Sequence, residues 1–331
     1  MADWFPETTK FFFGDDEAPK PSHHHPARDA ASDGGGALHL DVKSLSIREL
    51  RRSISDAGLG HSDCLERSEL EARFEEARSR EYTGPCPSPD GARAVEIAGL
   101  RCCVLGSPNP ELVVVIYHGY YAPASELVPL AQVLEARLHE GGHAVQFVLP
   151  QCGESAWFNL DFSSYVMAVL QGEAEKARVV RATPGGVEEM RASQSSFVAA
   201  LRERTGLPTS ALCLCGFSQG AMVALDVALH LDETCAGVVV LSGFVMAVER
   251  WAERLASRHR GIRVLQLHGL QDNTIPFYTA NWLCDLLKTN GARVMFIPHS
   301  GGHEFGPPHV FSSLLSFLTS LIPDNVNHLV A

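Results

Sequence analysis

Six short apolar runs, rich in β-branched residues and separated by stretches with helical spacing, constrain this chain more than any other feature of its sequence. The runs lie at residues 112–117, 144–149, 211–215, 237–241, 262–267 and 293–297. Helical patterns occupy several of the intervals, at 126–138, 187–203, 220–230, 278–288 and 309–321. Such alternation predicts an α/β fold with a mostly parallel, doubly wound sheet covered on both faces. The preceding pair, "AVEI" and "RCCVL", predicts an antiparallel hairpin at one edge.

Polar residues directly follow these runs, where an open parallel sheet binds its ligands. Ser218 follows the third run, Asp272 the fifth and His303 the sixth. Serine, acid and histidine in this chain order are typical of hydrolases whose nucleophile lies on a sharp strand-to-helix turn. The order therefore predicts a nucleophile, an acid and a base at one edge of the sheet.

The stretch "LCLCGFSQGAMVAL" at 212–225 supplies the expected turn. A nucleophile on such a turn has a strained backbone, and side chains two residues before and after it would collide. Gly216 and Gly220 remove those side chains. The helix that begins at Gln219 directs its amino-terminal N–H groups at the site, which favours an oxyanion there.

Each of these residues also has a purely structural interpretation. A lone G-x-S-x-G occurs often by chance, and Asp272 could cap a helix. His299 or His309 could be the base instead of His303. The chain order and the strand-end positions together favour the catalytic interpretation, and two glycines before His303 place it in a loop ahead of the last helix.

The segments "GFSQGAMVAL", "LSGF", "VLQLHGLQDNTIP" and "GGHEF" resemble the phospholipase/carboxylesterase family, which contains the acyl-protein thioesterases. The resemblance runs from about residue 93 to 322 and implies an α/β-hydrolase fold. It implies Ser218 as nucleophile, Asp272 as acid and His303 as base. It further implies an oxyanion hole made by the backbone N–H groups of Tyr120 and Gln219.

Three further residues are candidates for substrate binding. By the same resemblance, Trp157 lies where the family has an aromatic residue beside the acyl site, although a core tryptophan fits equally well. Phe244 follows a strand and could line an acyl-binding wall, or pack in the core. The family usually has a small Gly- or Asp-containing loop after His-Gly, whereas this chain has "YYAPASE". Tyr121 is therefore expected to reshape the rim of the site.

The amino-terminal part differs from the rest of the chain. Residues 1–40 are rich in Pro, Asp, Gly, Ala and His without a period, which predicts a disordered extension. Residues 41–81 predict a helix–connector–helix unit, with capping boxes at "SIRE" and "SELE", that resembles SAP-like units. Residues 82–92 are expected to form a linker, 93–323 the catalytic domain and 324–331 a tail.

Some SAP units bind DNA, but residues 41–80 hold eight Lys/Arg and nine Asp/Glu. That balance, with a net charge of −12 for the chain, favours a protein partner or a structural role over nucleic acid. Nine cysteines without a C-x-x-C pair or a secretory signal predict neither a disulfide framework nor a zinc site. No apolar stretch is long enough to span a bilayer, so a cytoplasmic protein without stable membrane insertion is expected.

The predicted reaction is acyl transfer from an ester or thioester to water, without a metal or an organic cofactor. A lipidated protein is one candidate substrate. Two alternatives remain open: the same triad acting on a peptide or lactone, and a catalytically silent interaction protein. The sequence identifies neither the acyl chain nor the leaving group.

Overall fold

The structure of the 331-residue chain is a computed structural model that describes residues 47, 50, 66–79, 92–152, 156–160, 165, 167, 168 and 170–323. The predicted extension at 1–40 and the predicted tail at 324–331 lie outside the described residues. So do the linker residues 81–91 and most of the first predicted helix. The proposed domain boundaries therefore stay predictions.

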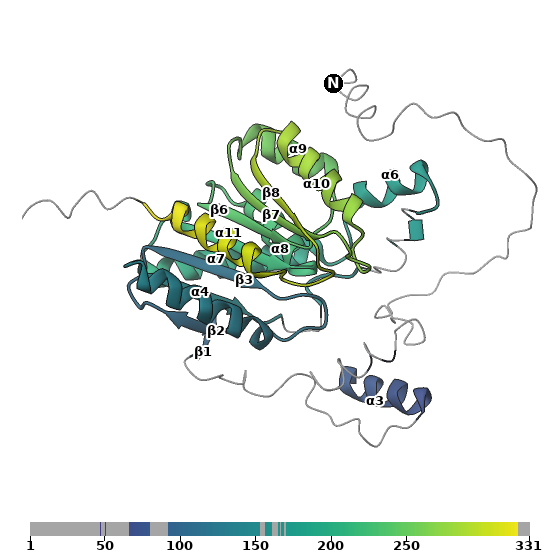
Figure 1. Cartoon of the computed structure of the whole chain (residues 1–331), viewed down its shortest axis with the longest axis horizontal. Coiled ribbons are helices and arrows are strands. Elements are labelled where there is room, and N and C mark those ends of the chain that lie inside the picture. Colours follow the sequence, from purple (N-terminus) through teal and green to yellow (C-terminus); the bar gives the residue numbers. More distant parts are fainter. Residues whose placement is uncertain are drawn as a thin grey trace, which may run out of the picture.

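An eight-stranded sheet, in the order β1-β2-β4-β3-β5-β6-β7-β8, forms the centre of the molecule (Figure 1). β1 and β2 pair antiparallel, as do β2 and β4, and all other neighbours are parallel. The predicted doubly wound sheet and its antiparallel edge hairpin are confirmed. The strands are β1 (Arg93–Ile97), β2 (Leu100–Gly106), β3 (Leu112–Tyr117), β4 (Val145–Pro150), β5 (Leu212–Phe217), β6 (Gly237–Leu241), β7 (Arg263–Gly269) and β8 (Arg293–His299).

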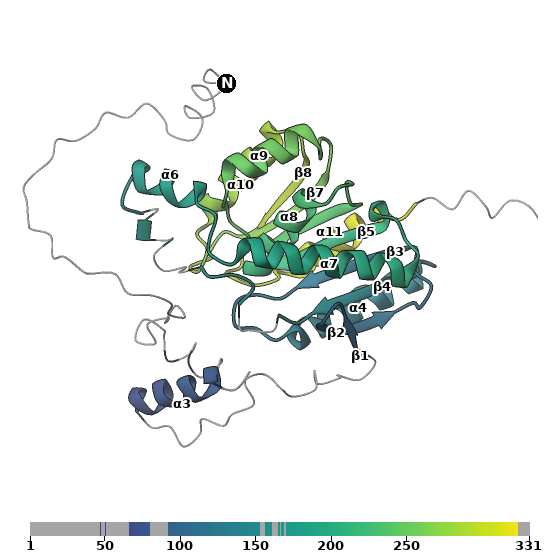
Figure 2. The ribbon, with the colours of Figure 1, turned by 180° about the vertical axis from the view of Figure 1, so that it is seen from behind.

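Helices cover both faces of the sheet. α4 and α11 pack on one face, and α7 and α8 with α9 and α10 pack on the other (Figures 1 and 2). α6 and α9 were not among the predicted helical segments. The helices of this part are α4 (Val128–Glu140), α6 (Glu173–Arg181), α7 (Val187–Thr205), α8 (Gln219–His230), α9 (Val248–Ser257), α10 (Phe277–Thr289) and α11 (Pro308–Leu321), with short 3₁₀ turns η2 (Ala124–Leu127) and η3 (Thr209–Ala211).

β3 illustrates why the sequences of the central strands are continuously apolar. Successive side chains of a strand point to opposite faces of the sheet. Val113, Val115 and Tyr117 enter the core under α7 and α8, whereas the alternate residues of the strand enter the core under α4 and α11. Because both faces are buried, neither set of positions can be polar.

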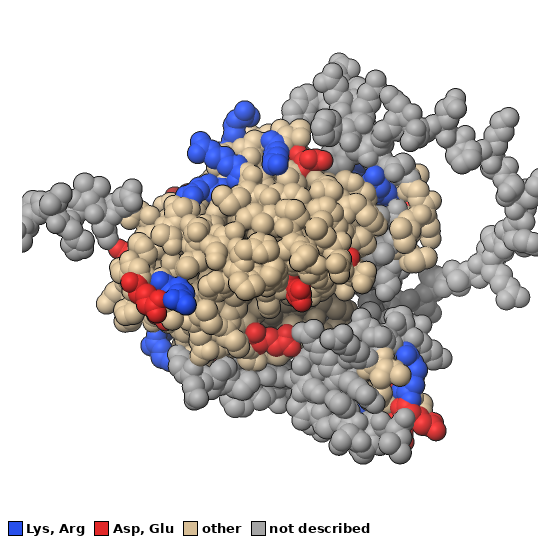
Figure 3. All heavy atoms as spheres, viewed as in Figure 1, with Lys and Arg blue, Asp and Glu red and all other residues tan. Residues whose placement is uncertain are grey.

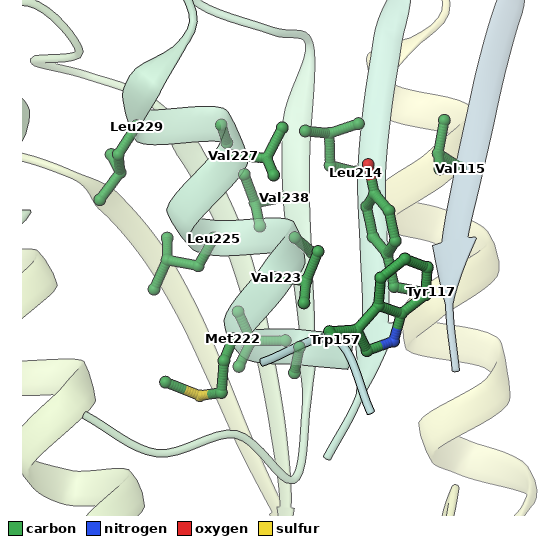
Figure 4. Packing of buried hydrophobic residues seen from close by; sticks show 14 of the residues in the cluster. Val115, Tyr117, Trp157, Leu214, Met222, Val223, Leu225, Val227, Leu229 and Val238 are labelled. Carbon is green, nitrogen blue, oxygen red and sulfur yellow. The ribbon is translucent and has the colours of Figure 1, made fainter. Parts of the chain in front are cut away.

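β5 and α8, which flank Ser218, are both deeply buried. All residues of α8 from Gln219 to Leu229 are buried. Figure 4 shows the packing of α8 on the sheet, with Trp157 beside Tyr117 near the first turn of the helix. Asp226 of α8, fully buried, accepts two hydrogen bonds from Arg191 at 2.6 and 2.8 Å and one from Trp251 at 2.8 Å. These bonds fix α8 to α7 and α9.

The thiols of Cys213 and Cys215 are buried in β5. Burial raises the pKa of Cys215 to about 12, so the thiol is inert. Cys103 of β2 is disulfide-bonded, a single bond that the cysteine spacing did not indicate. Six other cysteines in the described part of the chain form no disulfide.

The amino-terminal helix α3 (Arg67–Ser79) lies at the end of the sheet where the parallel strands finish, outside the two helical layers (Figures 1 and 2). Its predicted capping box is wrong in register. The helix begins at Arg67, before Ser68, and the N–H of Glu66 donates to Glu69 Oε2 at 3.0 Å. Glu71, predicted to reach back to the cap, instead pairs with Arg67 at 2.6 Å.

Figure 3 shows one face of the molecule, on which described Lys and Arg side chains gather mainly at the upper margin and leave the broad centre uncharged. The absence of a nucleic-acid partner stays a prediction. Across the part of the chain that the structure describes, no helix has the length and apolar character needed to traverse a bilayer.

Candidate active site

Ser218 lies on a sharp turn between β5 and α8. Its backbone has φ 55° and ψ −121°, a region that a residue with a side chain adopts only at a cost. Its N–H donates to the Leu241 carbonyl at 2.9 Å, which ties the turn to the end of β6. The sequence predicted this strained turn from the glycines that flank the serine.

The two flanking glycines are required by different neighbours. A Cβ on Gly216 would lie 2.0 Å from the Gly220 carbonyl oxygen, across the turn as predicted. A Cβ on Gly220 would lie 2.2 Å from the Tyr117 carbonyl oxygen and 2.5 Å from that of His118. Gly220 therefore permits close approach of the turn to the end of β3, a contact that the local pattern does not reveal.

Asp272 follows β7 and uses both carboxylate oxygens. Its Oδ1 accepts from the N–H groups of Thr274 at 2.9 Å and Ile275 at 2.7 Å. Its Oδ2 faces His303 Nδ1 at 2.8 Å. The alternative that Asp272 caps a helix is wrong, because α10 begins after Pro276 without a side-chain cap, and the carboxylate binds loop N–H groups and faces His303 instead. Burial opposes its ionisation, but the His303 hydrogen bond and charge and the Ile275 N–H outweigh it, so the pKa of Asp272 is lowered.

His303 lies in the loop after β8, and its side chain is 19% exposed. Because an ionised carboxylate only accepts hydrogen bonds, the contact with Asp272 places the proton of His303 on Nδ1 and leaves Nε2 as an acceptor. The ring packs on Phe217, the neighbour of Ser218, with centroids 4.8 Å apart. His299 is buried and accepts from the Gly301 N–H at 3.2 Å, whereas His309 is exposed at the start of α11. Of the three histidines, His303 is the one that the structure brings to Asp272.

His268, at the end of β7, is a neighbour of this pair that the sequence reasoning missed. Its Nε2 lies 2.8 Å from the Ile275 carbonyl and 3.5 Å from Asp272 Oδ2, and the side chain is fully buried. Burial lowers the pKa of His268, against the opposing effects of the Ile275 carbonyl and the Asp272 charge. The sequence signal that could have identified His268 is its position as a polar residue at the end of an apolar strand.

The 118–121 loop, which follows β3, faces Ser218 from the other side. A Cβ on Gly119 would lie 3.5 Å from Ser218 Cβ, so the loop and the serine are in direct proximity. His118 Nδ1 donates to the Gly119 carbonyl at 2.8 Å, and its Nε2 accepts from the Cys152 N–H at 3.2 Å. In a planar trans peptide the C=O and N–H groups point in opposite directions. The N–H of Tyr120 therefore points away from the His118 ring.

His118 is neutral in this arrangement. Burial lowers its pKa to about 4, although the hydrogen bond to Gly119 acts in the opposite direction. The neutral ring with a proton on Nδ1 satisfies both contacts at once. The sequence reasoning named His118 only as part of a His-Gly pair and gave it no role.

Side chains from three distant segments hold this region together. Trp157 Nε1 donates to the His118 carbonyl at 2.9 Å, and Gln151 Oε1 accepts from the Ala124 N–H at 2.8 Å. Gln219 Oε1 accepts from the Trp157 N–H at 3.0 Å, while its Nε2 donates to the Phe158 carbonyl at 2.9 Å. The first residue of α8 is thereby fixed to the segment that carries Trp157.

The three candidate substrate-binding residues lie in different environments. Trp157 is buried, with its ring edge-on to Tyr117 at 5.3 Å (Figure 4). Phe244 is also buried and packs on Tyr165 at 4.9 Å. Tyr121 is half-buried and lies in the 118–121 loop. Of the three, only Tyr121 has a partly exposed side chain.

Comparison with known proteins connects this geometry to hydrolases. Residues 182–322 match the family model described as Phospholipase/Carboxylesterase. A probable carboxylesterase of Oryza sativa subsp. japonica is 29% identical over 108 residues, 32% of this chain and 41% of the relative. Acyl-protein thioesterase 1 of Neurospora crassa is 25% identical over 121 residues, 36% of this chain and 49% of the relative. The chain thus spans less than half the length of these relatives.

Solved structures extend the likeness beyond residues 182–322. The crystal structure of esterase PE8 has 25% sequence identity and a TM-score of 0.52, covering 70% of this chain and 99% of the other. A carboxylesterase from Mesorhizobium loti has 18% identity and a TM-score of 0.52, with the same coverage of both chains. The predicted α/β-hydrolase fold is confirmed. The SAP-like character of residues 41–81 stays a prediction.

Proposed function

We propose that this protein is a serine hydrolase that cleaves carboxylic esters or acyl thioesters, in keeping with the match of residues 182–322 to the Phospholipase/Carboxylesterase family model. The observation that carries the proposal is the 2.8 Å contact between His303 Nδ1 and Asp272 Oδ2, next to a serine with φ 55°. Relatives called carboxylesterase, esterase and acyl-protein thioesterase support the substrate class.

In the proposed first step, Ser218 Oγ attacks the acyl carbonyl and His303 Nε2 takes its proton. Asp272 holds the ring in the tautomer that makes this possible and stabilises the positive charge that develops on it. His303 then gives the proton to the leaving alcohol or thiol, and an acyl-Ser218 ester remains. Water repeats the attack with His303 as base, which releases the carboxylic acid and restores the serine.

The proposed oxyanion hole consists of the N–H groups of Tyr120 and Gln219. Support comes from the orientation of the Gly119–Tyr120 peptide, whose carbonyl is bound by His118, and from the position of Gln219 at the start of α8. Such N–H groups stabilise the tetrahedral oxyanion, and each donor is worth about 10²–10³ in rate. No protein charge is required because the peptide dipoles are already oriented before the reaction.

The test combines active-site labelling with a substrate series. The full chain is treated with a fluorophosphonate, which phosphonylates an activated serine, and the labelled residue is identified by peptide mass spectrometry. Hydrolysis of p-nitrophenyl esters and of acyl thioesters of graded chain length is then measured. Ser218→Ala is the matched control for both assays.

We expect labelling at Ser218 and hydrolysis of at least one ester or thioester series, both lost in Ser218→Ala. An unlabelled Ser218, together with hydrolysis no higher than that of Ser218→Ala, would contradict the proposal. That outcome would favour the silent interaction protein. Cleavage of a peptide or lactone alone would keep the triad and replace the substrate class.

A further inference from the structure

The amino-terminal helix α3 contacts the 118–121 loop through one aromatic side chain. Leu70 and Phe74, four residues apart on one face of α3, are 2% and 1% exposed. The ring of Phe74 lies 6.1 Å from that of Tyr121, tilted by 55°. A helix that is remote in sequence thus reaches the loop beside Ser218.

Tyr121 adopts a backbone conformation that its residue type disfavours. Its φ is 54°, in the left-handed region where the Cβ of an L residue is too close to the backbone. A strained residue keeps such a conformation only where surrounding contacts hold it. Two ring contacts are available here, since Tyr121 packs edge-on against Tyr120 at 4.3 Å and against Phe74 on α3.

The conformation of Tyr121 bears directly on the proposed oxyanion hole. The N–H of Tyr120 belongs to the Gly119–Tyr120 peptide, and the carbonyl of that peptide accepts the N–H of Ala122, the residue after Tyr121, at 3.3 Å. If Tyr121 relaxed to negative φ, the chain would leave Tyr121 in another direction and this bond would break. The Gly119–Tyr120 peptide would then lose one of the two donors that orient its carbonyl.

We infer that Phe74 is a positioning residue for the oxyanion hole: by packing on Tyr121 it holds the 118–121 loop in the conformation that aims the Tyr120 N–H. This inference rests on the proposed function, because it assigns α3 a role in the same reaction. The amino-terminal helix is then a part of the catalytic machinery supplied from outside the hydrolase fold.

Phe74→Ala in the full chain tests the inference, with Leu70→Ala as the matched control. Both variants remove a buried apolar side chain from the same face of α3, but only the first removes the ring that contacts Tyr121. We expect Phe74→Ala to lower kcat for a short p-nitrophenyl ester about tenfold and the rate of fluorophosphonate labelling by a similar factor, with KM within about twofold. Leu70→Ala should lower kcat much less. Wild-type kcat in Phe74→Ala, or equal losses in both variants, would overturn the inference.

Variants of Tyr121 separate backbone positioning from simple loss of a ring. Glycine adopts positive φ without the steric cost that alanine meets. Tyr121→Gly should therefore retain more of kcat than Tyr121→Ala, although alanine keeps the larger side chain. In the Tyr121→Gly background, Phe74→Ala should have no further effect on kcat. Equal losses in the two Tyr121 variants would overturn positioning through the backbone.

The design distinguishes the inference from the proposed function. If the wild-type chain is labelled at Ser218 and hydrolyses the ester, but Phe74→Ala matches it in both assays, the inference alone fails. If the wild-type chain shows neither labelling nor hydrolysis, the proposed function fails and the inference fails with it. Circular dichroism of each variant establishes that a loss of kcat is not a loss of folded protein.

Discussion

The two sides of Ser218 are held in place by contacts of different range along the chain. On the acid–base side, Asp272 takes its hydrogen bonds from the N–H groups of Thr274 and Ile275, two and three residues further on. On the oxyanion side, the His118 ring is bound by Cys152, 34 residues away, and the His118 carbonyl by Trp157, 39 residues away. The Asp272 carboxylate is therefore held largely by local backbone, apart from its contact with His303, 31 residues away, whereas the oxyanion side depends on the assembled fold.

Asp272→Asn is the change with the largest expected effect, and it sharpens this contrast. The asparagine Oδ1 can still accept from Thr274 and Ile275, so the local turn should persist. Its amide nitrogen, in place of Oδ2, would donate to His303 Nδ1 and shift the ring proton to Nε2. A ring with that tautomer cannot take the Ser218 proton, and kcat should fall by about 10⁴.

The measurement is kcat on the best ester of the series, together with the free energy of unfolding in urea. We expect the unfolding free energy to change little beside the loss of rate. An Asp272→Asn variant that unfolds readily would show that the acid side is not locally stabilised. A variant with near-normal kcat would mean that Asp272 does not orient the base.

Gly220→Ala tests the close approach of the Ser218 turn to the end of β3. The new Cβ would lie 2.2 Å from the Tyr117 carbonyl oxygen, a backbone atom of β3 that cannot move without disturbing the sheet. We expect a loss of about 3 kcal/mol in the free energy of unfolding. Gly99→Ala is the control: Gly99 has φ 80° and no atom near its added Cβ, so only backbone strain, about 1 kcal/mol, is expected.

Urea unfolding at constant m-value compares the two glycine variants. Equal losses would show that positive φ matters as much as the contact with β3. They would also remove the argument that Gly220 joins the turn to the 118–121 loop.

The same contrast explains what the sequence could predict. The six strand segments, the elbow at Ser218 and the choice of His303 follow from apolar runs, glycine spacing and residues just after strands. These are local signals, and they coincide with the acid–base side. The side chains that hold the region around the 118–121 loop are those of Gln151, Trp157 and Gln219, and their partners become adjacent only when β3, β4 and α8 are packed together.

One wrong prediction and one missed contact, both involving α3, have the same origin. The capping box at Ser68 was chosen from a local pattern, but the helix begins at Arg67 and Glu69 accepts from the N–H of Glu66, two residues before Ser68. The bulky tyrosines after His118-Gly119 were expected to reshape the rim of the site. Nothing in the local sequence connects Tyr121 with Phe74, because that pairing requires α3 to lie beside the sheet.

His118 variants test whether the oxyanion side depends on the His118 ring, which connects the Gly119 carbonyl with the distant Cys152 N–H. His118→Leu removes the hydrogen bond to the Gly119 carbonyl, and we expect kcat to fall about 30-fold, less than the 10²–10³ that follows outright loss of an oxyanion donor. His118→Asn keeps a side-chain N–H near the position of Nδ1 and should lower kcat less than leucine does. Equal losses would show that the Gly119 carbonyl does not need this donor.

The smallest expected effect is on the pH dependence of the free energy of unfolding, to which His118 contributes. The pKa of His118 is about 4, below the ordinary value of 6.5, because burial disfavours its charged form. Between these two values the unfolded chain binds a proton at this residue that the folded chain does not. The free energy of unfolding should therefore fall as the pH decreases from about 6.5 towards 4.

His118→Asn removes that contribution, whereas buried His268 and His299, whose pKa values are also lowered, contribute equally to both proteins. The wild-type chain should lose more stability than the variant on going from pH 6.5 to 5.5, by up to about 1 kcal/mol. Urea unfolding at the two pH values measures the difference. Parallel losses in the two proteins would mean that His118 is protonated in the folded state, and a charged ring could not accept the Cys152 N–H that anchors the oxyanion side.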